Sequence, residues 1–185
     1  EAIRRNEGVV TAVGALTVAT GIHTGRSPKD KFIVDTPSIH DHINWGNVNK
    51  PISEENFESL FNKVTSYLQG SDVFVQDCFA GADPEYRLNV RVITESAWPN
   101  LFAQNMFIRP SVEQKQHFSP DFTVIHVPGL QAAGATDGVN SETFILVNFD
   151  RKMVLIGGSH YAGEIKKSIF GILNYLLPYR DVMPM

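Results

Sequence analysis

Apolar residues recur at helical spacing in two long segments of the chain, and these predict its main helices. Segment 54–68 repeats apolar residues every three or four positions, follows Ser53 and precedes Gly70, so a helix with a side-chain N-cap is expected. A second repeat over 165–177 ends at Pro178, which closes a helix beginning near residue 163 or 164. Weaker patterns predict two further helices, over 98–106 with Pro99 in the first turn, and after Ser111 with Gln114 completing a capping box.

Short apolar runs between turn residues predict the strands. They cover 9–18 (an extended segment bent at Gly14), 32–34, 73–75, 87–92, 122–127, 144–149 and 152–156. The last two flank Asp150-Arg151 and predict a hairpin that leads into the second long helix. Segment 35–51 is typical of a polar loop, and 129–138 of an exposed, mobile loop. Because strands and helices interleave with hairpins, the pattern predicts an α/β fold with a mixed sheet and flanking helices.

Composition narrows the class of protein. A length of 185 residues with 43% hydrophobic and 19% charged residues suits a single globular domain over 1–185. The net charge of −4 argues against a nucleic-acid surface, and no apolar run approaches a membrane span. Cys78 is the only cysteine and cannot form an internal disulfide, and no signal-peptide pattern opens the chain. We therefore expect a cytoplasmic protein.

The segment from Leu155 to Lys167 carries the first candidate site. Gly157 and Gly158 allow a tight turn after a strand, and Lys166 and Lys167 then fall at the start of a helix, where the dipole disfavours cations. A lysine amine that loses its proton there can act as a base or bind a metal, and a charged one can hold a phosphate. The alternative is that both lysines are solvated surface residues.

A basic loop over Thr20–Lys31 carries the second candidate site. Arg26 follows Gly25, and its planar guanidinium fits a carboxylate or phosphate through two hydrogen bonds. The alternative is a charged surface turn in which Asp30 pairs with a lysine. Other candidates have ordinary structural explanations. Arginines on the strand 87–92 are expected to pair with carboxylates such as Asp77 or Asp83, and His40 and His42 are expected to be solvated loop residues.

The chain contains neither a Gly-x-x-x-x-Gly-Lys-Ser/Thr phosphate loop nor a dinucleotide fingerprint. It does contain three long motifs: Thr24-Gly-Arg-Ser-Pro-Lys-Asp-Lys31, Asn105-Met-Phe-Ile-Arg-Pro-Ser111, and Tyr161-Ala-Gly-Glu-Ile-Lys-Lys167 with Asn174-Tyr-Leu-Leu-Pro178. Together these motifs resemble the ATP-dependent phosphoenolpyruvate carboxykinases. The resemblance covers nearly the whole chain, in the family's order.

The resemblance implies a lyase of gluconeogenesis, a decarboxylase that converts oxaloacetate and ATP to phosphoenolpyruvate, carbon dioxide and ADP with Mn²⁺ and Mg²⁺. In this family the enolate left by decarboxylation attacks the γ-phosphate, a transfer that depends on positioning and electrostatics. By resemblance, Arg26 binds the substrate carboxylate and Tyr161 lines the substrate pocket. Lys167 then binds manganese and approaches substrate and nucleotide, and Lys166 lies near the phosphates.

The resemblance also implies that the chain is the substrate-side N-terminal domain of a longer enzyme and packs against a C-terminal nucleotide-binding domain. In the family the phosphate loop and the metal-binding histidine and aspartate follow this domain, and the chain ends before them. We therefore expect the isolated chain to be inactive and to bind ATP weakly or not at all. The alternative is a stand-alone, non-catalytic anion-binding or regulatory module of the same fold.

Overall fold

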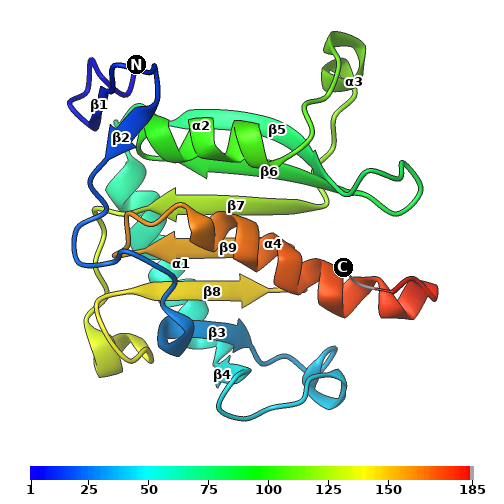
Figure 1. Ribbon diagram of the computed structural model, residues 1–185. Helices are drawn as coiled ribbons and strands as arrows, with labels where there is room; N and C mark the ends of the chain where they lie inside the picture. Colours follow the sequence, from blue (N-terminus) through cyan, green and yellow to red (C-terminus); the bar gives the residue numbers. More distant parts are fainter. Residues whose placement is uncertain (184–185) are drawn as a thin grey trace.

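A seven-stranded mixed sheet forms the centre of the computed structural model, which describes residues 1–183 (Figure 1). The strands lie in the order β4-β3-β8-β9-β7-β6-β5. They are β3 (Lys31–Val34), β4 (Lys50–Ile52), β5 (Phe74–Ala80), β6 (Leu88–Thr94), β7 (Phe122–Val127), β8 (Phe144–Asn148) and β9 (Met153–Gly157). Two more short strands, β1 (Gly8–Val10) and β2 (Leu16–Val18), form a separate hairpin. The expected α/β fold with a mixed sheet is confirmed.

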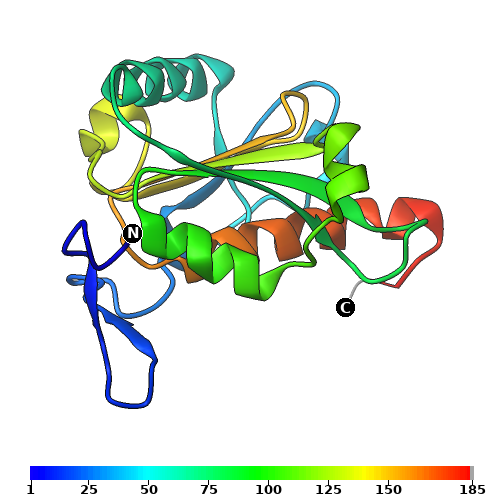
Figure 2. The ribbon, with the colours of Figure 1, turned by 90° about the horizontal axis from the view of Figure 1, so that it is seen from above.

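Helices cover both faces of the sheet, as Figure 2 shows. One face packs against α1 (Glu54–Leu68), whose Phe57, Leu60 and Val64 are fully buried against strand residues such as Leu155. The other face packs against α4 (Gly163–Leu176) and α2 (Ala97–Met106), and Ile165 and Ile169 are buried there. Strands covered on both sides must be apolar on both sides, which explains the continuous apolar runs of β8 and β9.

The helix signals in the sequence are confirmed. Ser53 caps α1 by accepting a hydrogen bond from the amide of Asn56 at 3.2 Å. The short helix α3 (Val112–Gln116) carries the expected reciprocal capping box between Ser111 and Gln114. The predicted hairpin is also present, because β8 pairs antiparallel with β9 across the turn at Asp150.

Three loop or strand predictions are wrong. The segment 9–18 is not one bent strand but two strands joined by a turn, because Gly14 has a φ of 84° and reverses the chain. The segment 35–51 contains the 3₁₀ turn η2 (His40–His42) and ends in the edge strand β4, where Pro51 is tolerated. The segment 129–138 is not fully exposed: it contains η3 (Gly134–Asp137), and Asp137 is buried in contact with Lys63.

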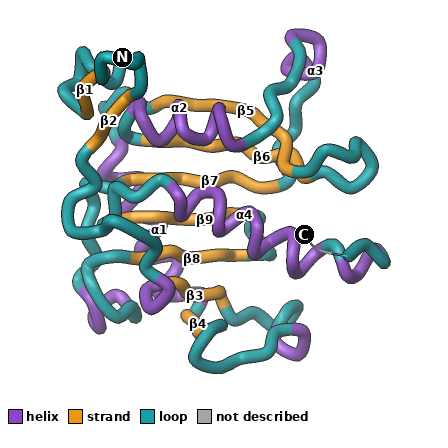
Figure 3. Tube along the Cα trace, in the orientation of Figure 1, coloured by secondary structure: helices purple, strands orange, loops and turns teal. Residues whose placement is uncertain are grey.

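The pairing directions bring distant segments to one end of the sheet. The first residue of β8 lies beside the last residue of β9, and β3 runs parallel to β8 with Lys31 beside Ile145. The loop before β3 and the turn after β9 therefore meet at the same end, where Figure 3 shows several long connections gathered. Within residues 1–183, no helix has both the length and the apolar character that a membrane crossing requires.

Candidate functional site

One pocket brings together the four residues singled out from the sequence. Arg26, Tyr161, Lys166 and Lys167 all line a cavity of about 490 Å³ at the N-terminus of α4. Phe102 and other side chains of α2 and α4 complete its wall. The two candidate segments, 20–31 and 155–167, thus form one shared cleft. Three cations and a phenol in one cavity suit a small multiply charged anion.

The turn between β9 and α4 depends on glycine. Gly158 has a φ of 67°, and a Cβ there would lie 2.4 Å from the carbonyl oxygen of Glu142. At Gly163, a Cβ would lie 2.4 Å from the ring of Tyr161, so the ring packs directly on the helix backbone. Gly158 therefore sets the direction of the turn, and Gly163 leaves the space that Tyr161 occupies.

Glu164 joins the two segments; it belongs to the Tyr161–Lys167 motif, but the sequence predicted no role for it. Glu164 is only 4% exposed, and its carboxylate accepts a hydrogen bond from the Ser27 backbone amide at 2.6 Å, next to Arg26. Burial raises the pKa of Glu164, while the Ser27 amide, Arg26 and Lys31 act in the opposite direction. Glu164 thus holds the arginine loop against the first turn of α4, and it balances part of the positive charge there.

His23 adds a second connection between the same parts. The Thr143 hydroxyl donates to the carbonyl oxygen of Gly158 at 2.9 Å, so it accepts from His23 Nε2 at 3.0 Å. In the neutral ring, His23 Nδ1 then accepts from the Ser27 hydroxyl at 3.1 Å. The loop, the start of β8 and the glycine turn are therefore fixed by one chain of hydrogen bonds.

Lys31 is a further cation of the site. It lines two cavities together with Lys167, and Arg26 lines one of these as well. Burial lowers the pKa of Lys31, with further lowering by Lys167 and Arg26 and an opposing effect of Glu164. Lys31 ends the basic loop and the first motif, but the sequence predicted no separate role for it. The structure shows that role because the start of β3 lies beside the start of β8.

Replacing Glu164 should loosen the arginine loop. In Glu164→Ala the Ser27 amide loses its acceptor, which should reduce the free energy of unfolding by about 1–3 kcal/mol. Tryptic cleavage after Arg26 should become faster. Urea titration and timed proteolysis measure the two effects. Glu164→Gln, which keeps an oxygen acceptor, should lose less, and the exposed Glu113→Ala should change neither; equal cleavage rates in all three would contradict the positioning role.

The remaining candidates have structural explanations, although not in every case the expected one. Arg91 pairs with Asp77 as predicted, through two hydrogen bonds at 2.7 and 2.9 Å, whereas Arg87 stacks on the ring of Phe79 at 3.6 Å instead. His40 is exposed and contacts Asp35 at 2.8 Å, which raises its pKa chiefly through that hydrogen bond. None of these side chains lines the pocket of Arg26 and Lys167.

The donor set of the pocket suits anions better than a metal ion. Within residues 1–183, no group of three His, Cys, Asp or Glu side chains is arranged to hold a metal. Lys167 can offer a single amine, and its Nζ lies 4.3 Å from the centre of the Phe170 ring, in contact with the π face. A full metal site would need ligands beyond those described.

Comparison with known proteins decides the family. The family model described as phosphoenolpyruvate carboxykinase matches residues 1–185, the whole chain. The chain belongs to the phosphoenolpyruvate carboxykinase family. Its motif-bearing segments are thus the carboxykinase segments that the sequence resemblance indicated, and the pocket is where this family's chain brings them together.

Several curated carboxykinases align with the entire chain. Phosphoenolpyruvate carboxykinase (ATP) of Geobacter sp. strain M21 is 57% identical over 185 residues. The protein of the same name from Brevibacillus brevis is 57% identical over 185 residues, and phosphoenolpyruvate carboxykinase (ATP) 2 of Moorella thermoacetica is 54% identical over 184. In all three the alignment covers 100% of this chain and 35% of the relative. The chain therefore spans about a third of the length of the carboxykinases it matches.

Proposed function

We propose that residues 1–185 form one domain, the substrate-side N-terminal portion of an ATP-dependent phosphoenolpyruvate carboxykinase. The observation that carries the proposal is the convergence of Arg26, Tyr161, Lys166 and Lys167 on one pocket. The relatives are named for this activity, and the chain corresponds to 35% of their length. The proposed reaction converts oxaloacetate and ATP to phosphoenolpyruvate, carbon dioxide and ADP.

Each pocket residue has a proposed task. Arg26 binds a substrate carboxylate through its guanidinium, and Tyr161 forms the wall of the substrate pocket from its place over Gly163. Lys166 and Lys167 supply positive charge where the enolate and the transferring phosphoryl group develop negative charge. Glu164 and His23 act as positioning residues, because they hold the Arg26 loop against α4.

A divalent metal and ATP belong to the proposal through the whole enzyme. Bound Mn²⁺ or Mg²⁺ stabilises negative charge on substrate and phosphate oxygens in such reactions. Lys167 contributes one amine ligand, and the remaining ligands, together with the main phosphate cradle, come from a C-terminal nucleotide-binding domain that packs against this one. Inside a cell the proposed location is the cytoplasm.

A segment exchange tests the proposal. We expect the 185-residue chain alone to show no turnover in an assay that couples phosphoenolpyruvate formation to NADH oxidation. A chimera is then made in which this chain replaces the matching segment of the Geobacter sp. strain M21 enzyme, which is 57% identical. Its turnover rate should lie within roughly tenfold of that of the unaltered Geobacter enzyme, because the chain supplies all the pocket residues. A folded, ATP-binding chimera without activity would contradict the proposal and favour a non-catalytic module. Turnover by the isolated chain would contradict its dependence on the second domain.

A further inference from the structure

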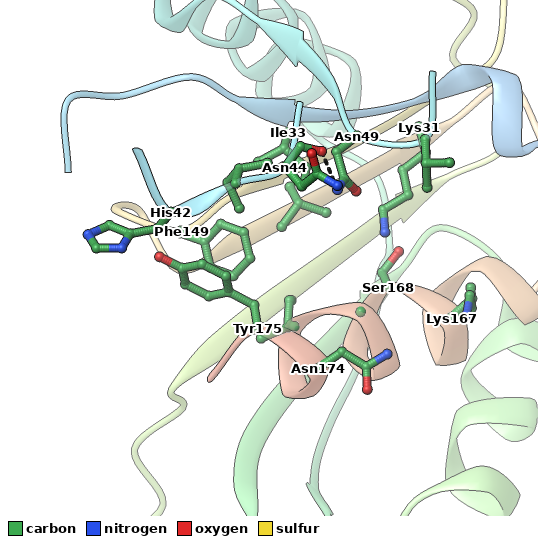
Figure 4. A pocket seen from close by; sticks show the side chains of 15 residues that line it. Lys31, Ile33, His42, Asn44, Asn49, Phe149, Lys167, Ser168, Asn174 and Tyr175 are labelled. Carbon is green, nitrogen blue, oxygen red and sulfur yellow. Dashed lines mark hydrogen bonds between the residues drawn. The ribbon is translucent and has the colours of Figure 1, made fainter. Parts of the chain in front are cut away.

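A second cavity lies beside the pocket of Arg26 and extends along α4 away from it. It has a volume of about 320 Å³ and lies between α4, the strands β3 and β8, and the loop before β4. Lys31 and Lys167 border it at the end nearest the first pocket, but Arg26, Tyr161 and Lys166 do not line it. In Figure 4 the amine of Lys31 points into this space, whereas Lys167 and Asn174 point away from it.

Lys31 presents a half-buried positive charge to this cavity, and no carboxylate contacts its amine directly in the described part of the chain. Within residues 1–183 the Lys31 amine forms no hydrogen bond and no ion pair within 4.0 Å. Gly171 of α4 makes room for the amine, since a Cβ there would lie 2.9 Å from Lys31 Nζ. A desolvated ammonium without a partner is unfavourable, so an anion reaching it would gain a strong, charge-assisted hydrogen bond.

Ser168 provides a second polar group at the same end. Its side chain is only 2% exposed, and no hydrogen bond of its hydroxyl is found within the described residues. Figure 4 shows this hydroxyl and the Lys31 amine directed toward one another across the cavity. An ammonium and a hydroxyl facing one point match the two oxygens of a carboxylate.

The rest of the cavity is largely apolar and aromatic. Phe149 and Tyr175 lie with ring centroids 4.4 Å apart at the far end. Ile33, Val147 and Ile172 form much of the wall between. Asn44 and Asn49 close one side, and the side-chain Nδ2 of Asn49 donates to the backbone carbonyl oxygen of Asn44 at 3.0 Å. Such a space favours a flat apolar body, as is usual for small-molecule sites of this size.

We propose that this cavity is a binding site for a small monocarboxylate with a flat apolar body, its carboxylate held by Lys31 and Ser168. A phosphate fits less well, because of the two lysines at this cavity only Lys31 points its amine into it (Figure 4), whereas the neighbouring pocket offers three cations for a doubly charged group. Lys167 lines both spaces, and Lys31 lines a further small cavity together with Arg26 and Lys167, so a carboxylate bound at Lys31 reduces the positive potential in the first pocket. Occupancy should therefore weaken anion binding there, and the effect is reciprocal. The site does not depend on the proposed reaction.

The test uses the 185-residue chain and benzoate, followed by two-dimensional amide NMR. Benzoate should shift the amides of Ser168, Gly171 and Tyr175 in a saturable manner. Neutral benzamide, and acetate, which lacks the apolar body, should bind at least tenfold more weakly. Lys31→Met should make benzoate and benzamide bind alike. The exposed Lys115→Met, a matched loss of one lysine charge, should leave benzoate affinity unchanged.

Gly171→Ala is a second test variant, and it should not destabilise the fold. Alanine is favoured over glycine inside a helix, so stability should rise, while the new methyl displaces the Lys31 amine and should lower benzoate affinity at least fivefold. Benzoate binding that persists unchanged in Lys31→Met and Gly171→Ala, or shifts confined to the amides around Arg26 and Tyr161, would overturn the proposal. Tighter binding of inorganic phosphate than of benzoate in this cavity would overturn it as well. These measurements record binding and need no enzyme activity, so their outcome does not depend on the result of the carboxykinase assay.

Discussion

His126→Gln should make the protein much less sensitive to acid. His126 lies in β7 with no exposed surface, and its Nε2–H donates to the carbonyl oxygen of Ser159 at 2.9 Å. Its Nδ1 is buried without a hydrogen-bond partner in the described part of the chain. A proton added at Nδ1 would therefore carry a charge into the core without an acceptor, and this burial lowers the pKa of His126 to about 4.

The sign of the effect follows from proton uptake. Between pH 6.5 and pH 4, His126 binds a proton in the unfolded chain but not in the folded protein. The free energy of unfolding therefore falls as the pH is lowered through this range. A difference of about 2.5 pH units corresponds to about 3 kcal/mol. The mismatch at His126 alone should lower the free energy of unfolding of the wild type by about that amount once the pH has fallen to 4. His126→Gln should not show this loss.

Urea unfolding at pH 7, 6, 5 and 4 measures the effect. The comparison is between slopes, because carboxylates elsewhere titrate in both proteins. Glutamine can keep the hydrogen bond to Ser159, so its stability at pH 7 should stay close to that of wild type unless packing changes. His117→Gln, at an exposed position, is the matched control and should follow the wild-type curve. Parallel curves for His126→Gln and wild type would show that the buried ring is not the acid-sensitive group.

In the chimeric carboxykinase, Arg26→Gln should lower kcat/KM for oxaloacetate by roughly 100-fold, about 3 kcal/mol of transition-state stabilisation. The guanidinium lines the pocket with Tyr161 and Lys167, is itself exposed, and makes no side-chain hydrogen bond or ion pair within the described residues. The fold should therefore be unaffected, and the loss should appear in catalysis alone. Arg4→Gln, which removes an arginine with an 83% exposed side chain, should change kcat/KM less than twofold.

Lys167→Met in the same chimera separates the metal role proposed for Lys167 from its contribution of positive charge. Loss of an amine ligand should shift the Mn²⁺ concentration needed for half-maximal activity upward by at least tenfold, while Arg26→Gln should leave that concentration nearly unchanged. Steady-state rates over a Mn²⁺ titration measure the shift. Normal activation by Mn²⁺ in Lys167→Met would remove the residue from the metal site and leave it a purely electrostatic role in the Arg26 pocket.

The regular elements were predictable because their signals are local. The cap at Ser53, the capping box at Ser111 and the hairpin turn at Asp150 each depend on a few consecutive residues. The short edge strand β4 was not predictable, because three residues containing Pro51 are extended only through pairing with β3. The hairpin of β1 and β2 needed the conformation of Gly14, which a single apolar run does not reveal.

The residues proposed to bind ligand were predictable from the sequence, whereas the contacts that join the two segments were not. Arg26 directly follows a glycine, and the lysine pair lies at the start of a helix, where the dipole disfavours cations. Both are therefore noticeable in the sequence alone. Glu164 and Lys31 lie within the motifs but stand out less on their own, because an acidic residue is favoured in the first turn of a helix and Lys31 is one of several cations in a basic loop. Their importance comes from neighbours more than 130 residues away, as the contact of Glu164 with Ser27 shows.

That contact has a kinetic consequence. Ser27 and Glu164 are separated by 137 positions, so closing this loop gains nothing until most of the chain between them has been ordered. Proteins rich in such long-range pairings fold slowly compared with those built from neighbouring contacts. Strand pairing in the middle of the sheet should therefore precede assembly of the Arg26 pocket. A nascent chain should acquire its β8–β9 hairpin well before it acquires any affinity for anions.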